Sequence, residues 1–156
     1  SDANEKQDIA ALTSAEMLVA KRISALFKTF RWKDKVAAKG DDARTHSGII
    51  AQDVQAAFAA ESLDASKYAL WCSDTWWEHD VNVPAVEADD TVTPPIEAAD
   101  GYIRTDTYDT QSEAPEGATS KTRMGIRYPE LLSFVAAYNE QRFAAIETRL
   151  TALEGN

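Results

Sequence analysis

The segment that most restricts how this chain can fold lies near its end, between Pro129 and Glu154. Apolar residues recur there at alternating spacings of four and three, which is the heptad repeat of helices that associate along one seam. The spacing predicts a long helix over these residues. The residues expected along its seam are Leu132, Ala136, Asn139, Phe143, Ile146, Leu150 and Leu153.

The charges beside this seam favour a parallel bundle. Arg142 and Arg149 fall on one flank of the seam, at heptad position g. Glu147 and Glu154 fall on the other flank, at position e, so an arginine of one helix faces a glutamate of its neighbour. Large residues at position a with isoleucine at d favour three or more helices over two. The alternative is a helix packed on its own domain, where Asn139 would be exposed or bonded within the monomer.

Composition excludes several classes of protein. A chain of 156 residues is long enough for one domain with a core. Its 26 acidic and 16 basic residues give a net charge of -10, which disfavours binding to nucleic acid or to an anionic membrane. The single Cys72 excludes an internal disulfide framework, and the apolar runs are too short for a membrane span or a secretory signal. No metal or other cofactor is expected.

Local patterns predict the elements of the first half. Thr13 to Phe27 begins with a capping-box pattern and continues with apolar residues at helical spacing, which predicts a helix. A short strand is expected around Phe30 and Trp32, followed by a turn. A buried strand over Gly48 to Ala51 is expected to pass into a helix at about Asp53 to Ala60. The aromatic-rich stretch from Tyr68 to Trp77 is expected to be partly extended.

The composition changes between about residues 73 and 122, where acidic residues, threonine and proline dominate. This stretch has few large apolar residues and no helical period, so it is expected to be a long arm containing at least one hairpin. The predicted fold is α+β, mostly helical with short strands. The expected divisions of the single domain 1–156 are a core over 1–72, a projecting arm over 73–122 and a trimerising helix over 123–156.

Two residues at the start of the chain could form a nucleophile and its general base. A serine becomes a nucleophile when a base takes its proton, and a lysine can be that base if burial lowers its pKa. Ser1 and Lys6 are close enough in sequence for their side chains to meet across a turn. If a precursor extended upstream, Ser1 could attack the carbonyl of the preceding residue. This reaction would turn over once and leave a chain beginning with serine.

Three motifs carry a resemblance to a known family. They are SDANEKQDI at the start, RTHSGIIAQDVQAAF in the middle and MGIRYPELLSFVAAYNEQRFAAIETRLTALE at the end. Their order, SD-x-x-x-K, H-x-G-x-IAQ-x-V and Y-x-EL before a heptad helix, resembles the intramolecular chaperone domains of phage tail spikes and tail fibres, the peptidase S74 type. The resemblance spans nearly the whole chain except the acidic arm.

The resemblance implies a function. Such domains lie at the carboxyl end of a fibre or spike precursor and form homotrimers. They help the upstream chains to fold into a triple β-helix and then release themselves by cleaving their own chain. This places the protein in the host cytoplasm during phage assembly and outside the mature virion. It implies that Ser1 is the nucleophile, Lys6 the general base and the bond before Ser1 the substrate, with no action in trans. Supporting roles near the cleavage site fall to Asp2, His46 and Gln52.

One position departs from the family pattern. Residue 4 is usually basic in the family, whereas this chain has Asn4. The change could weaken a contact to the upstream chain or to a neighbouring subunit. It does not touch the expected pair of Ser1 and Lys6.

Three alternative functions are compatible with some of these residues. The first is a trimeric fibre tip that stays attached and binds a receptor or glycan through exposed aromatic residues. Its candidate stacking residues are Trp71, Trp76, Trp77 and Tyr102. The second is a metal site or a hydrolytic site, although its candidate residues match no known ligand spacing. They are His46, Cys72, Glu78, His79 and Asp80. The third is that Ser1 is an arbitrary start and Lys6 a solvated residue.

Overall fold

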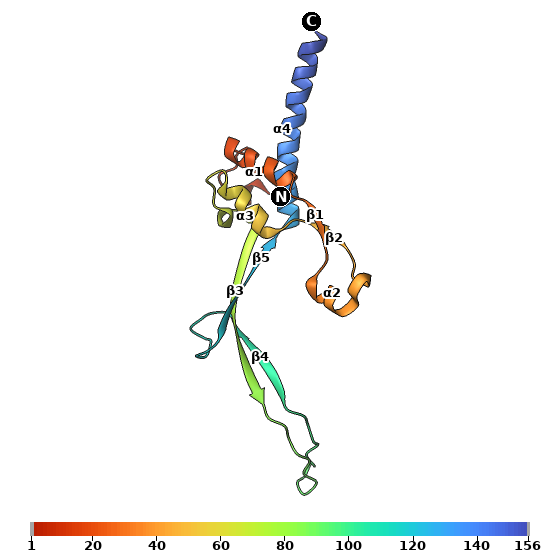
Figure 1. Ribbon diagram of the computed structural model, residues 1–156. Helices are drawn as coiled ribbons and strands as arrows, with labels where there is room; N and C mark the ends of the chain where they lie inside the picture. Colours follow the sequence, from red (N-terminus) through yellow and green to blue (C-terminus); the bar gives the residue numbers. More distant parts are fainter. Residues whose placement is uncertain (1, 156) are drawn as a thin grey trace. The chain divides into compact units, whose positions relative to one another are not determined.

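The protein is described by a computed structural model in which residues 2–155 are placed. The fold is α+β, with α-helices α1 to α4 and strands β1 to β5 in the described part (Figure 1). The chain divides into two compact units. One runs up to Cys72 and resumes at Met124, and the other comprises residues 73–123. The two units are described separately below.

The first unit is built around three helices: α1 (Ser14–Ser24), α3 (Ala51–Ala59) and α4 (Tyr128–Glu154). Short 3-10 turns also lie in this unit, at Ala3–Glu5, Gly40–Asp42 and Ala65–Lys67. The helices bury one apolar cluster that removes large side chains from water. Its residues are Val19, Ala20, Ile23, Ile49, Val54, Ala57, Phe58, Ala65, Leu70, Trp71, Leu131, Phe134 and Val135.

The predicted capping box of α1 is present. The Thr13 hydroxyl accepts from the Glu16 backbone N–H at 3.2 Å, and the Glu16 carboxylate accepts from the Thr13 backbone N–H at 2.6 Å. The same carboxylate accepts from the Tyr68 hydroxyl at 2.9 Å. The backbone N–H of Thr13 holds the pKa of Glu16 below its usual range, and the hydroxyls of Tyr68 and Thr13 act in the same direction. The helix expected up to Phe27 ends at Ser24.

The long C-terminal helix α4 forms as predicted and starts one residue earlier, at Tyr128. Only its first turns are buried: Leu131, Phe134 and Val135 pack into the core. The side chains expected along the seam do not belong to this buried face. Leu132, Ala136, Phe143, Ile146, Leu150 and Leu153 are exposed, and Asn139 is half-buried. The seam therefore does not pack against this chain's own core in the described residues.

A short two-stranded ribbon connects α1 with α3. Strands β1 (Lys28–Phe30) and β2 (His46–Gly48) pair antiparallel, with Phe30 opposite His46. Both strands lie a few residues earlier than predicted, and α3 begins two residues earlier, at Ala51. A helix that the sequence analysis did not predict, α2 (Lys33–Lys39), follows β1. Lysine and alanine have high helix propensity, which explains why this segment forms a helix.

The second unit is ordered by its own strand pairing. Its sheet has the order β4–β3–β5 and is formed by β3 (Trp71–Val83), β4 (Tyr102–Tyr108) and β5 (Thr119–Ile126). β3 and β4 are antiparallel from Trp77 opposite Tyr108 to Val83 opposite Tyr102. The hairpin expected near Tyr102 is thus present. At 13 residues, β3 is longer than the short strands that were expected.

Candidate functional site

The N-terminal motif forms a small structure of its own. The Asp2 carboxylate accepts from the backbone N–H of Asn4 at 2.9 Å and from its side-chain amide at 3.0 Å, which caps the turn Ala3–Glu5. The Lys6 Nζ donates to the backbone carbonyl of Asp2 at 3.3 Å. Lys6 is therefore folded back towards the start of the chain. Ser1 itself, the expected nucleophile, lies outside the described residues.

This segment is not covered by its own domain. Every residue from Asp2 to Ala11 is exposed, including Lys6, and the side chain of Ile9 is 70% exposed. A lysine becomes a useful base through burial, which disfavours its charged form. The single chain does not supply that burial for Lys6 in its described residues.

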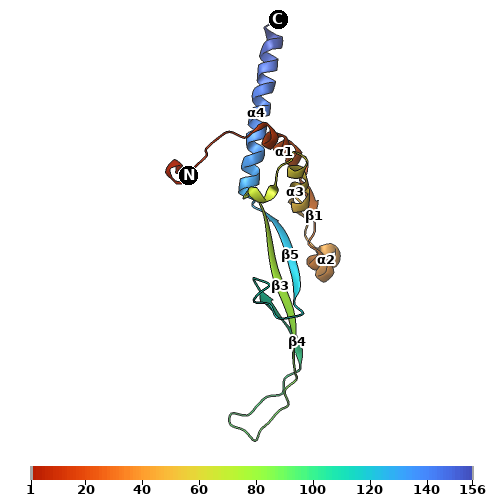
Figure 2. The same cartoon turned by 90° about the vertical axis from the view of Figure 1, so that its left-hand side faces the viewer.

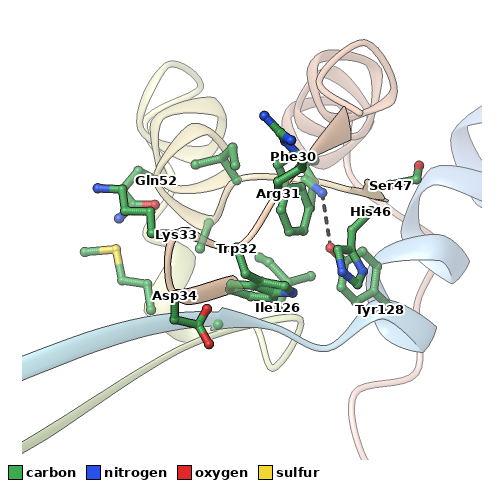
Figure 3. A pocket seen from close by; sticks show the side chains of 15 residues that line it. Phe30, Arg31, Trp32, Lys33, Asp34, His46, Ser47, Gln52, Ile126 and Tyr128 are labelled. Carbon is green, nitrogen blue, oxygen red and sulfur yellow. Dashed lines mark hydrogen bonds between the residues drawn. The ribbon is translucent and has the colours of Figure 1, made fainter. Parts of the chain in front are cut away.

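A groove of about 810 Å³ lies in the first unit, between the β1–β2 ribbon, the starts of α2 and α3, and the residues that lead into α4 (Figure 3). Aromatic and aliphatic side chains line most of it, notably Phe30, Trp32 and Ile126. Arg31 and Lys33 contribute positive charge, and the nearby Asp34 carboxylate is paired with Lys35 at 3.1 Å. Such a groove combines apolar contact with a few charged groups, as binding sites commonly do.

The middle and final motifs meet at this groove. The Tyr128 hydroxyl accepts a hydrogen bond from the backbone N–H of Ile49 at 3.1 Å (Figure 3). The same hydroxyl lies so close to Gly48 that a Cβ there would overlap it. Gly48 is thus required by the close approach of Tyr128. The glycine of H-x-G and the tyrosine of Y-x-EL are one structural unit.

Two of the three expected supporting residues, His46 and Gln52, lie together in this groove. His46 stacks on Phe30, with ring centroids 5.9 Å apart, and its edge meets Trp32 at 6.2 Å. Gln52, at the start of α3, lines the same groove. Asp2 and Lys6 are not among the residues that line it. Figure 2 places the N-terminal segment, in dark red, on the other side of α4 from β1.

Sequence reasoning missed part of this groove. Trp32, Arg31 and Tyr128 line it, although only Tyr128 belonged to a quoted motif and no role was assigned to any of them. The available signal was the Phe30–Trp32 alternation, which was interpreted as strand pattern alone. One residue of the glycan-binding alternative is excluded as a stacking residue. Trp71 is buried in the core and donates from its indole nitrogen to the Ala51 carbonyl at 3.0 Å, so it cannot stack on a sugar ring.

The residues weighed for metal binding do not form a cluster in the described part of the chain. Among residues 2–155, no group of three or more His, Cys, Asp or Glu side chains is placed to hold an ion. In the second unit, the Nδ1 atom of His79 is buried without a hydrogen-bond partner. None of the helices in residues 2–155 combines the length and the apolar character that crossing a membrane requires.

Known proteins resemble this chain along most of its length. Residues 1–63 match the Peptidase_S74 family, described as chaperone of endosialidase. The probable tail spike protein of Klebsiella phage 0507-KN2-1 is 33% identical over 96% of this chain. The tail spike protein of Escherichia virus K5 is 32% identical over 91% of it. The chain covers only 11% and 18% of these two proteins.

Solved structures share the fold. The carboxy-terminal domain of the bacteriophage T5 L-shaped tail fibre, solved with its intramolecular chaperone domain, has a TM-score of 0.68 at 25% identity. The match covers 97% of this chain and 31% of that structure. A second structure, described as a novel intramolecular chaperone, has a TM-score of 0.58 at 24% identity and is matched over 99% of its length.

The fold and these matches define an intramolecular chaperone domain of the phage tail spike and tail fibre type. The chain belongs to the Peptidase_S74 family of intramolecular chaperone domains found in phage tail spikes and tail fibres.

Proposed function

We propose that this domain assists the folding of an upstream tail spike or fibre as a homotrimer, and that it then releases itself by cutting the bond before Ser1. The N-terminal segment carries this proposal. Its SD-x-x-x-K motif is held by the Asp2 cap, and the Lys6 ammonium lies 3.3 Å from the Asp2 carbonyl oxygen. Lys6 is thus directed to the part of the chain where the cut would occur.

The chemistry requires only these two side chains and water. A neutral Lys6 amine accepts the proton of the Ser1 hydroxyl as Oγ attacks the carbonyl carbon of the preceding residue. The peptide C–N bond breaks, and the proton passes from Lys6 to the departing Ser1 nitrogen. The upstream chain is then joined to Oγ as an ester. Water hydrolyses this ester, giving an upstream carboxylate and a free Ser1, so each chain reacts once.

The trimer has a physical purpose. A triple β-helix depends on pairing between chains, which is slow because distant segments must meet, and its unpaired edges aggregate. A parallel bundle along α4 would hold three chains in register while they pair. The exposed seam residues of α4, such as Phe143 and Leu150, are available for this contact. The net charge of -10 would discourage assembled trimers from adhering to one another.

The proposal is tested on the precursor, in which this chain is joined to its upstream segment. Wild type is compared with Ser1→Ala and Lys6→Arg on a denaturing gel, and intact mass locates the cut. Arginine keeps the positive charge but cannot become a neutral base, so we expect Lys6→Arg to stay whole, as Ser1→Ala does. Lys39→Ala, which removes an exposed lysine of α2, is the matched control and should be cut normally.

The outcomes separate the possible functions. A wild-type precursor that splits before Ser1, with both variants whole, supports the proposed reaction. A wild-type trimer that folds fully but stays joined contradicts it, and favours a permanent trimeric tip instead. Cleavage that persists in Lys6→Arg would leave Ser1 as the nucleophile and remove Lys6 from the mechanism.

A further inference from the structure

We propose that the N-terminal segment of one copy, residues 2–11, docks in the groove of a neighbouring copy, so that each cleavage site is completed by two subunits. The inference rests on the proposed trimer and on the proposed cleavage. It joins two parts of the site that the single chain keeps separate: the motif around Lys6, and the groove that contains His46 and Gln52.

The first argument is the direction of the N-terminal segment. Figure 2 shows it leaving the start of α1 and extending on the side of α4 that faces away from α1, α3 and β1. All of its residues from Asp2 to Ala11 are exposed there. A segment that folds onto its own core would instead be partly buried. This one extends into space that the first unit of its own chain leaves open.

The second argument is the position of a neighbour. Residues of a helix advance by about 100° each, so the seam containing Leu132 and Ala136 lies roughly 150° around α4 from the buried face containing Leu131 and Phe134. A copy that associates along the seam therefore lies on the side that α1 and α3 leave uncovered. Packed helix axes are about 10 Å apart, and the six residues from Lys6 to Ala11, which follow the turn, span at most about 20 Å when extended. The segment is long enough to reach a neighbour.

The third argument is the chemical match between segment and groove. Trp32 lies over the groove with 55% of its surface exposed, and Ile9 is the large aliphatic side chain of the segment. Arg31 and Lys33 outnumber Asp34 among the charged residues that line the groove, whereas Asp2, Glu5 and Asp8 outnumber Lys6 in the segment. Apolar contact would supply affinity, and the opposite charges would select the orientation.

Docking would also provide what the chemistry lacks in the single chain. Covering the segment would remove water from around Lys6 and favour its neutral form. The side-chain amide of Gln52 can donate to the oxygen that becomes negative as Ser1 attacks. His46 acts as a positioning residue through its stack with Phe30 and Trp32. An unassembled chain would then be unable to cut itself, which ties release to assembly.

Mixed trimers of the precursor test this arrangement. One chain carries Ser1→Ala and an intact groove. The other keeps Ser1 and carries Trp32→Ala with His46→Ala, two exposed residues whose loss leaves the core intact. Tags of different size identify each chain on a gel. Alone, the groove variant should be cut at least tenfold more slowly than wild type. In mixed trimers about half of its chains should be cut, because about half of their neighbours carry an intact groove.

Two results would overturn docking between subunits. In one, the groove variant stays whole in mixed trimers while wild type mixed with Ser1→Ala is cut, which would mean that the groove serves its own chain. In the other, the groove variant alone is cut as fast as wild type, which would mean that the groove is not needed.

A second measurement does not depend on cleavage. In a Cys72→Ser background, chains with Ile9→Cys are coexpressed with chains carrying Trp32→Cys and then oxidised. We expect a disulfide between the two differently tagged chains. Gln55→Cys, on the exposed face of α3 outside the groove, is the matched partner that should give none. If wild type is never cut but this cross-link forms, the proposed cleavage is contradicted and the proposed docking is supported. If the cross-link is absent from assembled trimers, the docking fails.

Discussion

The two halves of α4 differ in what surrounds them. In the first turns, Leu131, Phe134 and Val135 are buried in the core of the first unit. From Glu140 onward every described side chain is exposed, among them Phe143 at 61% and Leu153 at 73%. A single amphipathic helix would bury one apolar stripe along its whole length. This helix has one stripe for its own core and a second that its own core does not cover.

The difference shows how one helix can contribute both to the core of its own chain and to association between copies. Most of the stability of a helix in a protein comes from packing an apolar face. The first half obtains this within the chain, and in the proposed trimer the second half obtains it from other copies. Folding of the first unit and assembly should therefore respond to different substitutions, and three predictions test this separation.

The largest effect is expected from a charge in the seam. Leu150→Asp would bring three carboxylates together in the apolar interior of the proposed bundle, at a cost of about several kcal/mol per trimer. We expect the precursor to lose its trimeric mass in sedimentation while its helix content falls only over the second half of α4. Thr151→Asp adds the same charge off the seam and should stay assembled. Equal behaviour of the two variants would contradict the seam.

A smaller effect is expected from a substitution in the buried first half of α4. Leu131 is fully buried, so Leu131→Ala should lower the free energy of unfolding by about 2 to 5 kcal/mol at every protein concentration. The adjacent Leu132 lies on the seam and is exposed in the single chain. Leu132→Ala should act through association, so its effect should depend on protein concentration. Denaturant unfolding of both variants over a range of concentrations distinguishes core from seam.

The sequence predicted what depends on local pattern. The capping box at Thr13 and Glu16 and the bounds of α4 follow from residues close together in the chain, and both are present. The helix α2 was missed because glycine and aspartate turn signals beside it outweighed the propensity of KDKVAAK. The acidic arm was expected to contain at least one hairpin, and β3 and β4 pair with each other as such a hairpin.

The groove was beyond prediction for a different reason. The contact between Gly48 and Tyr128 joins residues that are far apart in sequence, and no local period encodes it. Each residue was visible in its own motif. Only the fold shows that the glycine is needed because the tyrosine hydroxyl occupies the space of its missing Cβ.

The smallest effect is expected from acid acting on the capping box of α1, which belongs to the core and not to the seam. The pKa of Glu16 is lowered, first by the backbone N–H of Thr13, so the folded state favours the carboxylate. Its contribution is complete above the pKa of the unfolded chain and disappears as pH falls through the lowered folded value. Glu16→Gln should therefore lower the free energy of unfolding by about 1 kcal/mol at neutral pH, and by almost nothing once the pH lies below the lowered folded value.

The measurement is urea unfolding across this pH range in the Leu150→Asp background, so that association does not contribute. The seam variant alone is the reference, and the difference between it and the double variant isolates Glu16. Because Glu16 also accepts from the Tyr68 hydroxyl, Tyr68→Phe should remove part of the same pH dependence. A pH-independent difference would mean that packing, and not the carboxylate, accounts for the effect. A difference that varied with protein concentration would link this cap to the assembly, and so contradict the separation of the two halves.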